Sequence, residues 1–129
     1  MALAWVLADE AGPEPSAAKQ RAAAEGAMVP SFWRLEVANA LRNAVRRKRC
    51  SEIDATRSLH LFDELEINVD AETDSHAWGE TRTLSRKYNL TLYDAAYLEL
   101  AIRRRLPLAS RDEELLAAAR KARVDTVRE

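Results

Sequence analysis

Short apolar runs alternate with longer helical patterns along this chain of 129 residues. Three runs are short enough to be buried strands, namely Ala27 to Val29, Ile67 to Val69 and Leu106 to Ala109. Val124 to Val127 fits a last short strand. Alternation of this kind is typical of a parallel sheet that is covered by helices on both faces. The pattern therefore predicts a helix-rich α/β fold, and the length predicts a single domain over residues 1–129.

Helical patterns fill the segments between these runs. Their predicted bounds are Glu14 to Ala24, Phe32 to Arg47, Glu52 to Glu64, Glu72 to Tyr88, Leu92 to Arg105 and Glu113 to Ala122. Polar residues suited to helix capping precede four of these segments: Ser31, Ser51, Thr91 and Asp112. The segment that starts at Leu92 is apolar on nearly all sides, which predicts a helix buried in the fold or in a subunit contact.

Composition and charge exclude several classes of function. The chain has three Gly, which argues against a glycine-rich phosphate loop, and one Cys, which excludes a disulfide framework and a cysteine-rich zinc site. Its net charge of -1 removes any global electrostatic case for nucleic-acid binding, so only local clusters of cations could support one. With two His and one Cys, any metal ligands should be carboxylates.

Three acidic residues lie beyond the predicted strands or at the starts of neighbouring helices. Glu36 follows the strand that ends at Val29, Asp94 begins the apolar helix, and Asp112 follows the strand that ends at Ala109. Because parallel strands present their carboxyl ends at one edge of a sheet, these carboxylates would converge there. Converging carboxylates repel one another unless a divalent cation lies among them, and oxygen-only ligands suit Mg²⁺ or Mn²⁺. Metal-assisted phosphodiester hydrolysis is the chemistry that follows.

Each of these acids also has a structural interpretation. Glu36 shares a polar helical stripe with Asn39 and Asn43, which fits a solvated outer face. Asp94 completes a Thr-x-x-Asp capping box, and Asp112 fits a helix N-cap. Taken singly, each acid is explained by its local role, and only their convergence favours the metal site.

Two runs of cations lie near predicted helix ends. Five cations fall within residues 42–49, and residues 103–105 are all Arg. Both runs could bind an RNA backbone, and both could instead complement the negative end of a helix dipole. Five aromatic side chains could stack on bases, but the chain has few aromatic residues, and a place in the core or in a dimer contact fits them better: Trp5, Trp33, Trp78, Tyr93 and Tyr97.

Four segments resemble PIN-domain ribonucleases of the VapC toxin type. In chain order they are Ala2 to Glu10, Val29 to Leu41, Leu92 to Ala101 and Leu106 to Asp112. The resemblance implies a three-layer α/β/α domain around a parallel sheet. It also implies a Mg²⁺- or Mn²⁺-dependent endoribonuclease, usually a homodimer, which a cognate VapB-type antitoxin inhibits by laying its C-terminal segment across the active site.

The resemblance also assigns roles to residues. It implies that Glu36, Asp94 and Asp112 are metal-site acids and that Ser110 supplies a hydroxyl beside them. Asn39 matches a polar position one helical turn from Glu36. A receiver-type signalling domain would need paired acids after an early strand and a later Lys, and the sequence shows no such arrangement.

The start of the chain departs from the family pattern. Members usually begin with an apolar strand ending in an Asp ligand, a few residues before the segment that matches Ala2 to Trp5. Asp9 and Glu10 match a later acidic pair in the family and do not simply replace that ligand. We therefore expect that the first, central strand is absent and that the native reading frame begins upstream. A catalytically defective PIN-like module that binds antitoxin or RNA is the alternative.

The opening residues also bear on location. Met1 to Ala8 is apolar, but it lacks a positively charged start and meets Asp9 at once, so it predicts neither a signal peptide nor a membrane span. The lone Cys50 fits a reducing compartment. We therefore expect a cytoplasmic protein with no membrane partner.

Overall fold

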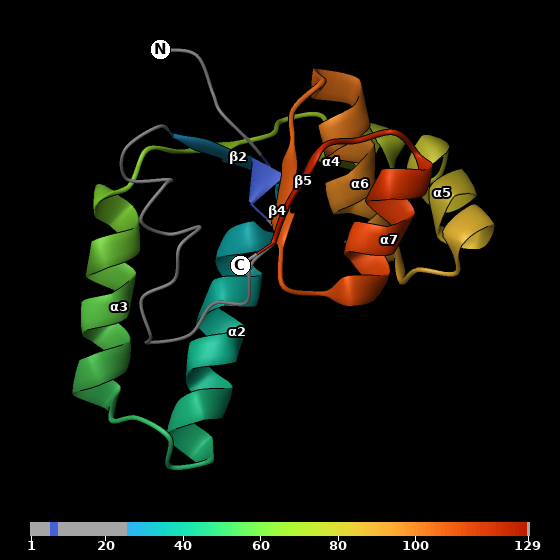
Figure 1. Ribbon diagram of the computed structural model, residues 1–129. Coiled ribbons are helices and arrows are strands. Elements are labelled where there is room, and N and C mark those ends of the chain that lie inside the picture. The colour runs from blue at the N-terminus through green and yellow to red at the C-terminus, as the bar shows by residue number, and fades with distance from the viewer. Residues whose placement is uncertain (1–5, 8–25, 129) are drawn as a thin grey trace.

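Among the residues that the computed structural model describes, 6–7 and 26–128, five short strands form one sheet. The strands are β1 (Val6–Leu7), β2 (Ala27–Val29), β3 (Ile67–Val69), β4 (Leu108–Ser110) and β5 (Thr126–Arg128). Their order is β3-β2-β1-β4-β5, and every neighbouring pair is parallel. β2 and β3 lie on one side of β1, and β4 and β5 lie on the other, so the chain crosses the sheet between β3 and β4 (Figure 1).

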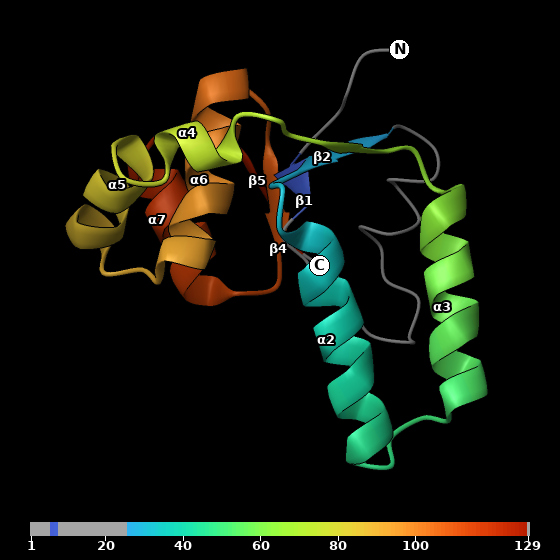
Figure 2. The ribbon, with the colours of Figure 1, turned by 180° about the vertical axis from the view of Figure 1, so that it is seen from behind.

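Helices lie on both sides of this sheet, as Figure 1 and the reverse view in Figure 2 show. One side carries α2 (Trp33–Arg46) and α3 (Glu52–Glu64). The other carries α4 (Thr73–His76), α5 (Glu80–Tyr88), α6 (Leu92–Arg104) and α7 (Glu113–Lys121). The arrangement is a helix-rich three-layer α/β/α fold, which confirms the predicted fold class.

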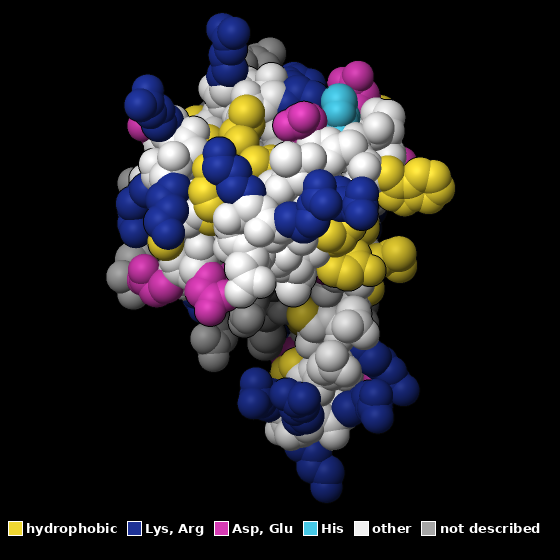
Figure 3. Space-filling model, turned by 90° about the vertical axis from the view of Figure 1, so that its right-hand side faces the viewer, with side chains coloured by type: hydrophobic (Ala, Val, Ile, Leu, Met, Phe, Trp, Pro, Cys, Tyr) yellow, Lys and Arg dark blue, Asp and Glu magenta, His cyan; other side chains and the backbone are white. Residues whose placement is uncertain are grey.

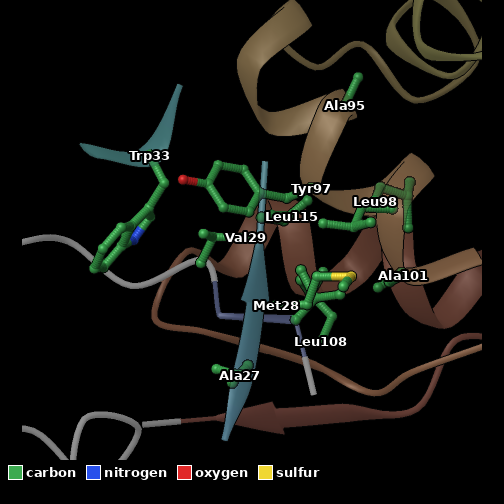
Figure 4. Packing of buried hydrophobic residues seen from close by; sticks show 14 of the residues in the cluster. Ala27, Met28, Val29, Trp33, Ala95, Tyr97, Leu98, Ala101, Leu108 and Leu115 are labelled. Atoms are coloured by element: carbon green, nitrogen blue, oxygen red, sulfur yellow. The ribbon is translucent and has the colours of Figure 1, made fainter. Parts of the chain in front are cut away.

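The core is centred on the contact between the sheet and α6. Seven consecutive residues of α6, Ala95 to Ala101, are buried, which confirms that a helix apolar on nearly all sides lies inside the fold. Figure 4 shows Leu98 and Ala101 of this helix beside Met28 and Leu108 of the sheet. Burial of these side chains is the main favourable contribution to folding, at roughly 25 cal/mol per Å² of apolar surface.

The expected absence of the central strand is corrected by the structure. Val6–Leu7 lies between β2 and β4, and Val6 pairs with Met28 on one side and Leu108 on the other. Val6 is fully buried, and its N–H donates to the Pro107 carbonyl at 2.8 Å. The resemblance to the family had placed Val6–Leu7 after the first strand of the family fold. A short apolar run fits a buried strand and a buried helix equally well, so the pattern alone could not decide between them.

The long helix predicted over Glu72 to Tyr88 is also corrected, because it is divided into α4 and α5. Gly79 is the N-cap residue of α5, with φ -102° and ψ -108°, which is not a helical conformation. Glycine is unfavourable inside a helix because it loses more conformational entropy on folding than any other residue. Ending the helix at Gly79 therefore costs little free energy.

The predicted caps are confirmed for three helices and wrong for one. The side chains of Ser51, Thr91 and Asp112 each accept a backbone hydrogen bond at the start of α3, α6 and α7. Ser31 does not cap α2, because the helix begins one residue later, with Phe32 as its N-cap residue and no side-chain cap. The Ser31 N–H donates to Thr73 Oγ1 at 3.0 Å. The helix predicted over Glu14 to Ala24 lies outside the described residues.

None of the helices in the described ranges combines the length and hydrophobicity needed to cross a membrane.

Candidate active site

The three predicted acids lie at helix starts beside the carboxyl ends of β2 and β4. Glu36 is in the first turn of α2, which follows β2, and Asp94 is in the first turn of α6. Asp112 is the N-cap residue of α7, two residues after β4. The positive end of a helix dipole favours negative charge, so each helix stabilises the carboxylate that it carries.

The carboxylates are near enough to perturb one another. Burial raises the pKa of Asp94, the Asp112 and Glu114 carboxylates raise it further, and a hydrogen bond from Thr91 opposes them. Burial is also the main cause that raises the pKa of Glu36, where Tyr97 opposes it and the Asp94 carboxylate adds to it. Asp94 therefore interacts with an acid on either side. We refer to Glu36, Asp94 and Asp112 together as the acidic edge.

Tyr97 holds one member of the acidic edge in place. Its hydroxyl donates a hydrogen bond from α6 to Glu36 Oε1 on α2. Figure 4 shows this hydroxyl directed toward the start of α2, near Trp33. The Tyr97 side chain is 5% exposed, and its ring packs edge-to-face on Phe32 with the ring centroids 5.7 Å apart. The prediction that Tyr97 belongs to the core is confirmed.

The hydrogen bond of Tyr97 to Glu36 was not predicted from the residue pattern. The available signal was the spacing of three residues between Asp94 and Tyr97, which places both on one face of a helix. An aromatic residue at that spacing also suits a purely apolar core position, so the spacing alone did not reveal a polar role for the hydroxyl.

Asp112 and Ser110 are joined by hydrogen bonds at the end of β4. Asp112 Oδ1 accepts from the N–H groups of Glu114 at 2.9 Å and Leu115 at 3.3 Å, which confirms the N-cap interpretation. Ser110 is fully buried, and its Oγ accepts from the Asp112 N–H at 3.0 Å. Both capping bonds use Oδ1 and neither uses Oδ2, so the capping role does not occupy the whole carboxylate.

The donor chemistry of the acidic edge suits a hard divalent cation. The donors are all carboxylate oxygens, and their mutual repulsion would be relieved by a bound positive charge. Within the described ranges, no three His, Cys, Asp or Glu side chains form a group arranged to hold a metal ion. Mg²⁺ usually keeps several waters and binds through one or two carboxylates, so it does not require a closed group of three protein ligands. Asp9 and Glu10 lie outside the described residues.

Arg103, the first residue of the basic run at residues 103–105, lies in the last turn of α6 and is held by acidic side chains. Its guanidinium bonds the Asp70 carboxylate at 2.6 Å and the Glu99 carboxylate at 2.7 Å, and a longer contact of 3.4 Å joins it to Glu72. The side chain of Arg103 is 17% exposed, and that of Asp70 is 2% exposed. Arg103 therefore ties α6 to the end of β3 and is unavailable to RNA.

Comparisons with known proteins bear on the family and the fold of this chain. The family model described as "PIN domain" matches residues 2–121. The crystal structure of PAE2754 from Pyrobaculum aerophilum resembles the fold, with a TM-score of 0.73 and 23% sequence identity over 99% of this chain and 92% of that chain. A search of curated proteins found no significant match. At this identity the structural likeness concerns the fold alone.

Proposed function

Since this chain belongs to the PIN domain family, we propose that it is a Mg²⁺- or Mn²⁺-dependent endoribonuclease of the VapC toxin type. The family supports a nuclease-type function, because PIN domains are usually metal-dependent nucleases. The observation that carries the proposal is the acidic edge, where Asp94 interacts with Glu36 on α2 and with Asp112 before α7. Perturbed carboxylates that share one site are typical of catalytic centres.

Each residue has a role in the proposed reaction. Glu36, Asp94 and Asp112 would hold the cation through carboxylate oxygens, and Tyr97 would keep Glu36 oriented. Ser110 would fix the backbone that carries Asp112 and, with the exposed Asn39 on α2, orient water or ligands. When bound, the ion would lower the pKa of water and stabilise charge on the leaving oxygen.

The proposal includes protein partners and a cytoplasmic location. Exposed apolar side chains adjoin the acids in the sequence: Leu35 is 76% exposed, Leu92 is 42% exposed and Tyr93 is 62% exposed. Apolar surface beside a polar site suits a protein contact. A second copy of the chain and the C-terminal segment of a VapB-type antitoxin are the proposed partners, and the antitoxin would inhibit the enzyme by covering the acidic edge.

Cleavage of a synthetic single-stranded RNA with Mn²⁺, and separately with EDTA, tests the function. We expect cleavage only with the metal. Asp94→Asn should reduce it by at least about 100-fold, since loss of even an outer-shell partner costs 10–100-fold. Asp74→Asn changes an exposed Asp on α4 and serves as the control. Cleavage that persists in EDTA would contradict the proposal. Unchanged specific activity of a strongly destabilised Asp94→Asn would show that Asp94 only supports the helix start.

A PIN-like module without nuclease activity is the second candidate. It is favoured by the open arrangement of the acids, because the described part of the chain holds no closed group of three potential ligands. Thermal unfolding during a Mn²⁺ titration separates the two candidates. A competent acidic edge should raise Tm with increasing Mn²⁺, since a ligand that binds only the folded state stabilises it, whereas a defective site should give no shift.

A further inference from the structure

The last turns of α2, the connection to α3 and the first turns of α3 carry a dense group of cations, the basic tip: Arg42, Arg46, Arg47, Lys48, Arg49 and Arg57. Residues 42–57 contain six cationic and two acidic side chains, although the whole chain has a net charge of -1. The α2–α3 hairpin projects away from the other helices in Figures 1 and 2, and Figure 3 shows Lys and Arg side chains gathered at its lower end.

Complementing the helix dipole explains only part of the basic tip. Arg46 is in the last turn of α2 and Arg47 is its C-cap residue, but Lys48 and Arg49 lie beyond the helix end. These four side chains are exposed, and none of them forms an ion pair with another described residue. Adjacent like charges destabilise one another, so folding alone does not favour this concentration of cations.

The two acids of the segment offset the charge incompletely. Glu52 pairs with Arg42 at 3.7 Å, and both side chains are well exposed. The Asp54 carboxylate is occupied in a capping box, where it accepts from the Ser51 N–H at 3.2 Å. The basic tip is therefore left with a local excess of positive charge that suits a polyanion.

One stripe of α2 connects the acidic edge with the basic tip. Glu36, Asn39, Asn43 and Arg47 lie on one face of the helix, because Arg47 comes three full turns after Glu36. Asn39 is exposed and Asn43 is half-buried. A rise of about 1.5 Å per residue places Arg47 about 16 Å along the axis from Glu36. Phosphates of one strand in a stacked nucleic acid are about 3.4 Å apart along the axis, so the stripe spans about five nucleotides.

We infer that this stripe and the basic tip bind the backbone of single-stranded RNA on one side of the phosphodiester bond that is cut at the acidic edge. The inference rests on the proposed function and adds where the flanking nucleotides lie. Amide and guanidinium groups donate hydrogen bonds to phosphate and sugar oxygens, and the Arg fork matches phosphate geometry. Such contacts fix the position of a strand and carry no base specificity.

Salt-dependent RNA binding tests the inference. Binding of a short labelled single-stranded RNA is followed by fluorescence anisotropy in EDTA, which prevents cleavage. The test variant combines Arg46→Gln, Arg47→Gln and Arg49→Gln. The control combines Arg104→Gln, Arg120→Gln and Lys121→Gln, which removes the same charge from exposed cations in the last turns of α6 and α7. If cations at helix ends served the dipole alone, both triplets would behave alike.

We expect the tip variant to weaken RNA binding at least about tenfold and to reduce the slope of log K against log salt by about 2, at roughly 0.7 per lost phosphate contact. The control should keep the slope of the wild type. Equal losses in both triplets, or none in the tip variant, would overturn the inference while leaving wild-type cleavage, and hence the proposed function, intact. Displacement of the RNA by polyglutamate as readily as by unlabelled RNA would assign the tip to an acidic protein instead. A wild type that neither binds nor cleaves RNA would overturn both proposals.

Discussion

Tyr97 and Glu36 show how a core side chain supports the candidate site. The Tyr97 ring is held between the core and Phe32, so its hydroxyl reaches Glu36 from a fixed position. Glu36 itself lies on an exposed part of α2, where a carboxylate without such a partner would sample several rotamers. The hydrogen bond therefore limits the orientations of the Glu36 carboxylate before any ligand binds.

Tyr97→Phe keeps the packed ring and removes the hydroxyl. We expect the affinity for Mn²⁺, measured by titration calorimetry, to fall on the order of tenfold, which is typical when a partner that orients a ligand is lost. Tyr93→Phe is the control, because the Tyr93 side chain is 62% exposed. Adding Tyr97→Phe to Glu36→Gln should cost nothing further if Tyr97 acts through Glu36. An additive loss in the double variant would refute that role.

Asp70 and Arg103 form the most buried ion pair among the described residues. Burial alone would raise the pKa of Asp70, but hydrogen bonds from Arg103, Thr73 and the Glu72 N–H together lower it. A carboxyl whose pKa is lowered on folding contributes stability above its unfolded value of about 3.8, and this contribution is lost as the pH falls through the folded value. The pair should therefore add to the loss of stability in acid.

Asp70→Asn should lower the free energy of unfolding by about 1.5–3 kcal/mol at neutral pH, since the charge-assisted hydrogen bonds of Asp70 are lost while Glu99 still pairs with Arg103. Asp63→Asn is the control, because the exposed pair of Asp63 with Arg34 contributes less than about 1 kcal/mol. Urea unfolding from pH 7 down to pH 3 measures both effects. The stability of Asp70→Asn should fall less steeply with acid than that of the wild type. Identical pH profiles would contradict the assignment.

At the level of elements, the start of α7 combines folding and function in one residue. Asp112 caps the helix through Oδ1, while its charge raises the pKa of Asp94 across the site. The cap requires only an oxygen acceptor, whereas a cation requires negative charge. Substitutions can therefore separate the two roles.

Asp112→Asn and Asp112→Ala should differ in stability but not in metal binding. Asn caps helices about as well as Asp, so Asp112→Asn should keep the unfolding free energy within about 0.5 kcal/mol of the wild type, whereas Asp112→Ala should lose about 1 kcal/mol. Both should lose Mn²⁺ affinity in calorimetry. If Asp112→Asn bound Mn²⁺ as the wild type does, Asp112 would be a helix cap only.

Elements with strong local signals were predictable from the sequence. The bounds of α3 agree with the prediction, because Ser51 and Asp54 specify its start and close a capping box. The break before α5 was missed because the pattern of apolar residues continues across Gly79, and only the backbone conformation at this residue reveals the end of a helix. Local periodicity predicts which face of a helix is buried more reliably than where the helix stops.

For the whole molecule, the sheet explains which parts of the site could be predicted. The helix starts that carry Glu36, Asp94 and Asp112 lie at one edge of the sheet because the strands are parallel, and the alternation of strands and helices was enough to predict that order. The place of Val6–Leu7 in the sheet and the contact of Tyr97 with Glu36 depend on pairings between segments far apart in the chain. A single sequence carries little information on such pairings.

The near-neutral overall charge is a sum of opposite charges that lie apart in the fold. Acids gather beside the carboxyl ends of the strands, and cations gather at the end of the α2–α3 hairpin. Folding stability gains little from either group, since like charges repel in both. A divalent cation bound at the acidic edge and an RNA backbone bound at the basic tip would each relieve the repulsion between like charges.

Calorimetric titration of Mn²⁺ into the wild type and Asp94→Asn tests most directly whether the acidic edge is a cation site. We predict a saturable binding event for the wild type and for the control Asp74→Asn, and its loss in Asp94→Asn with the fold retained by circular dichroism. Absence of saturable binding to the wild type, or equal binding by wild type and Asp94→Asn, would contradict the assignment of these carboxylates to a metal-dependent nuclease.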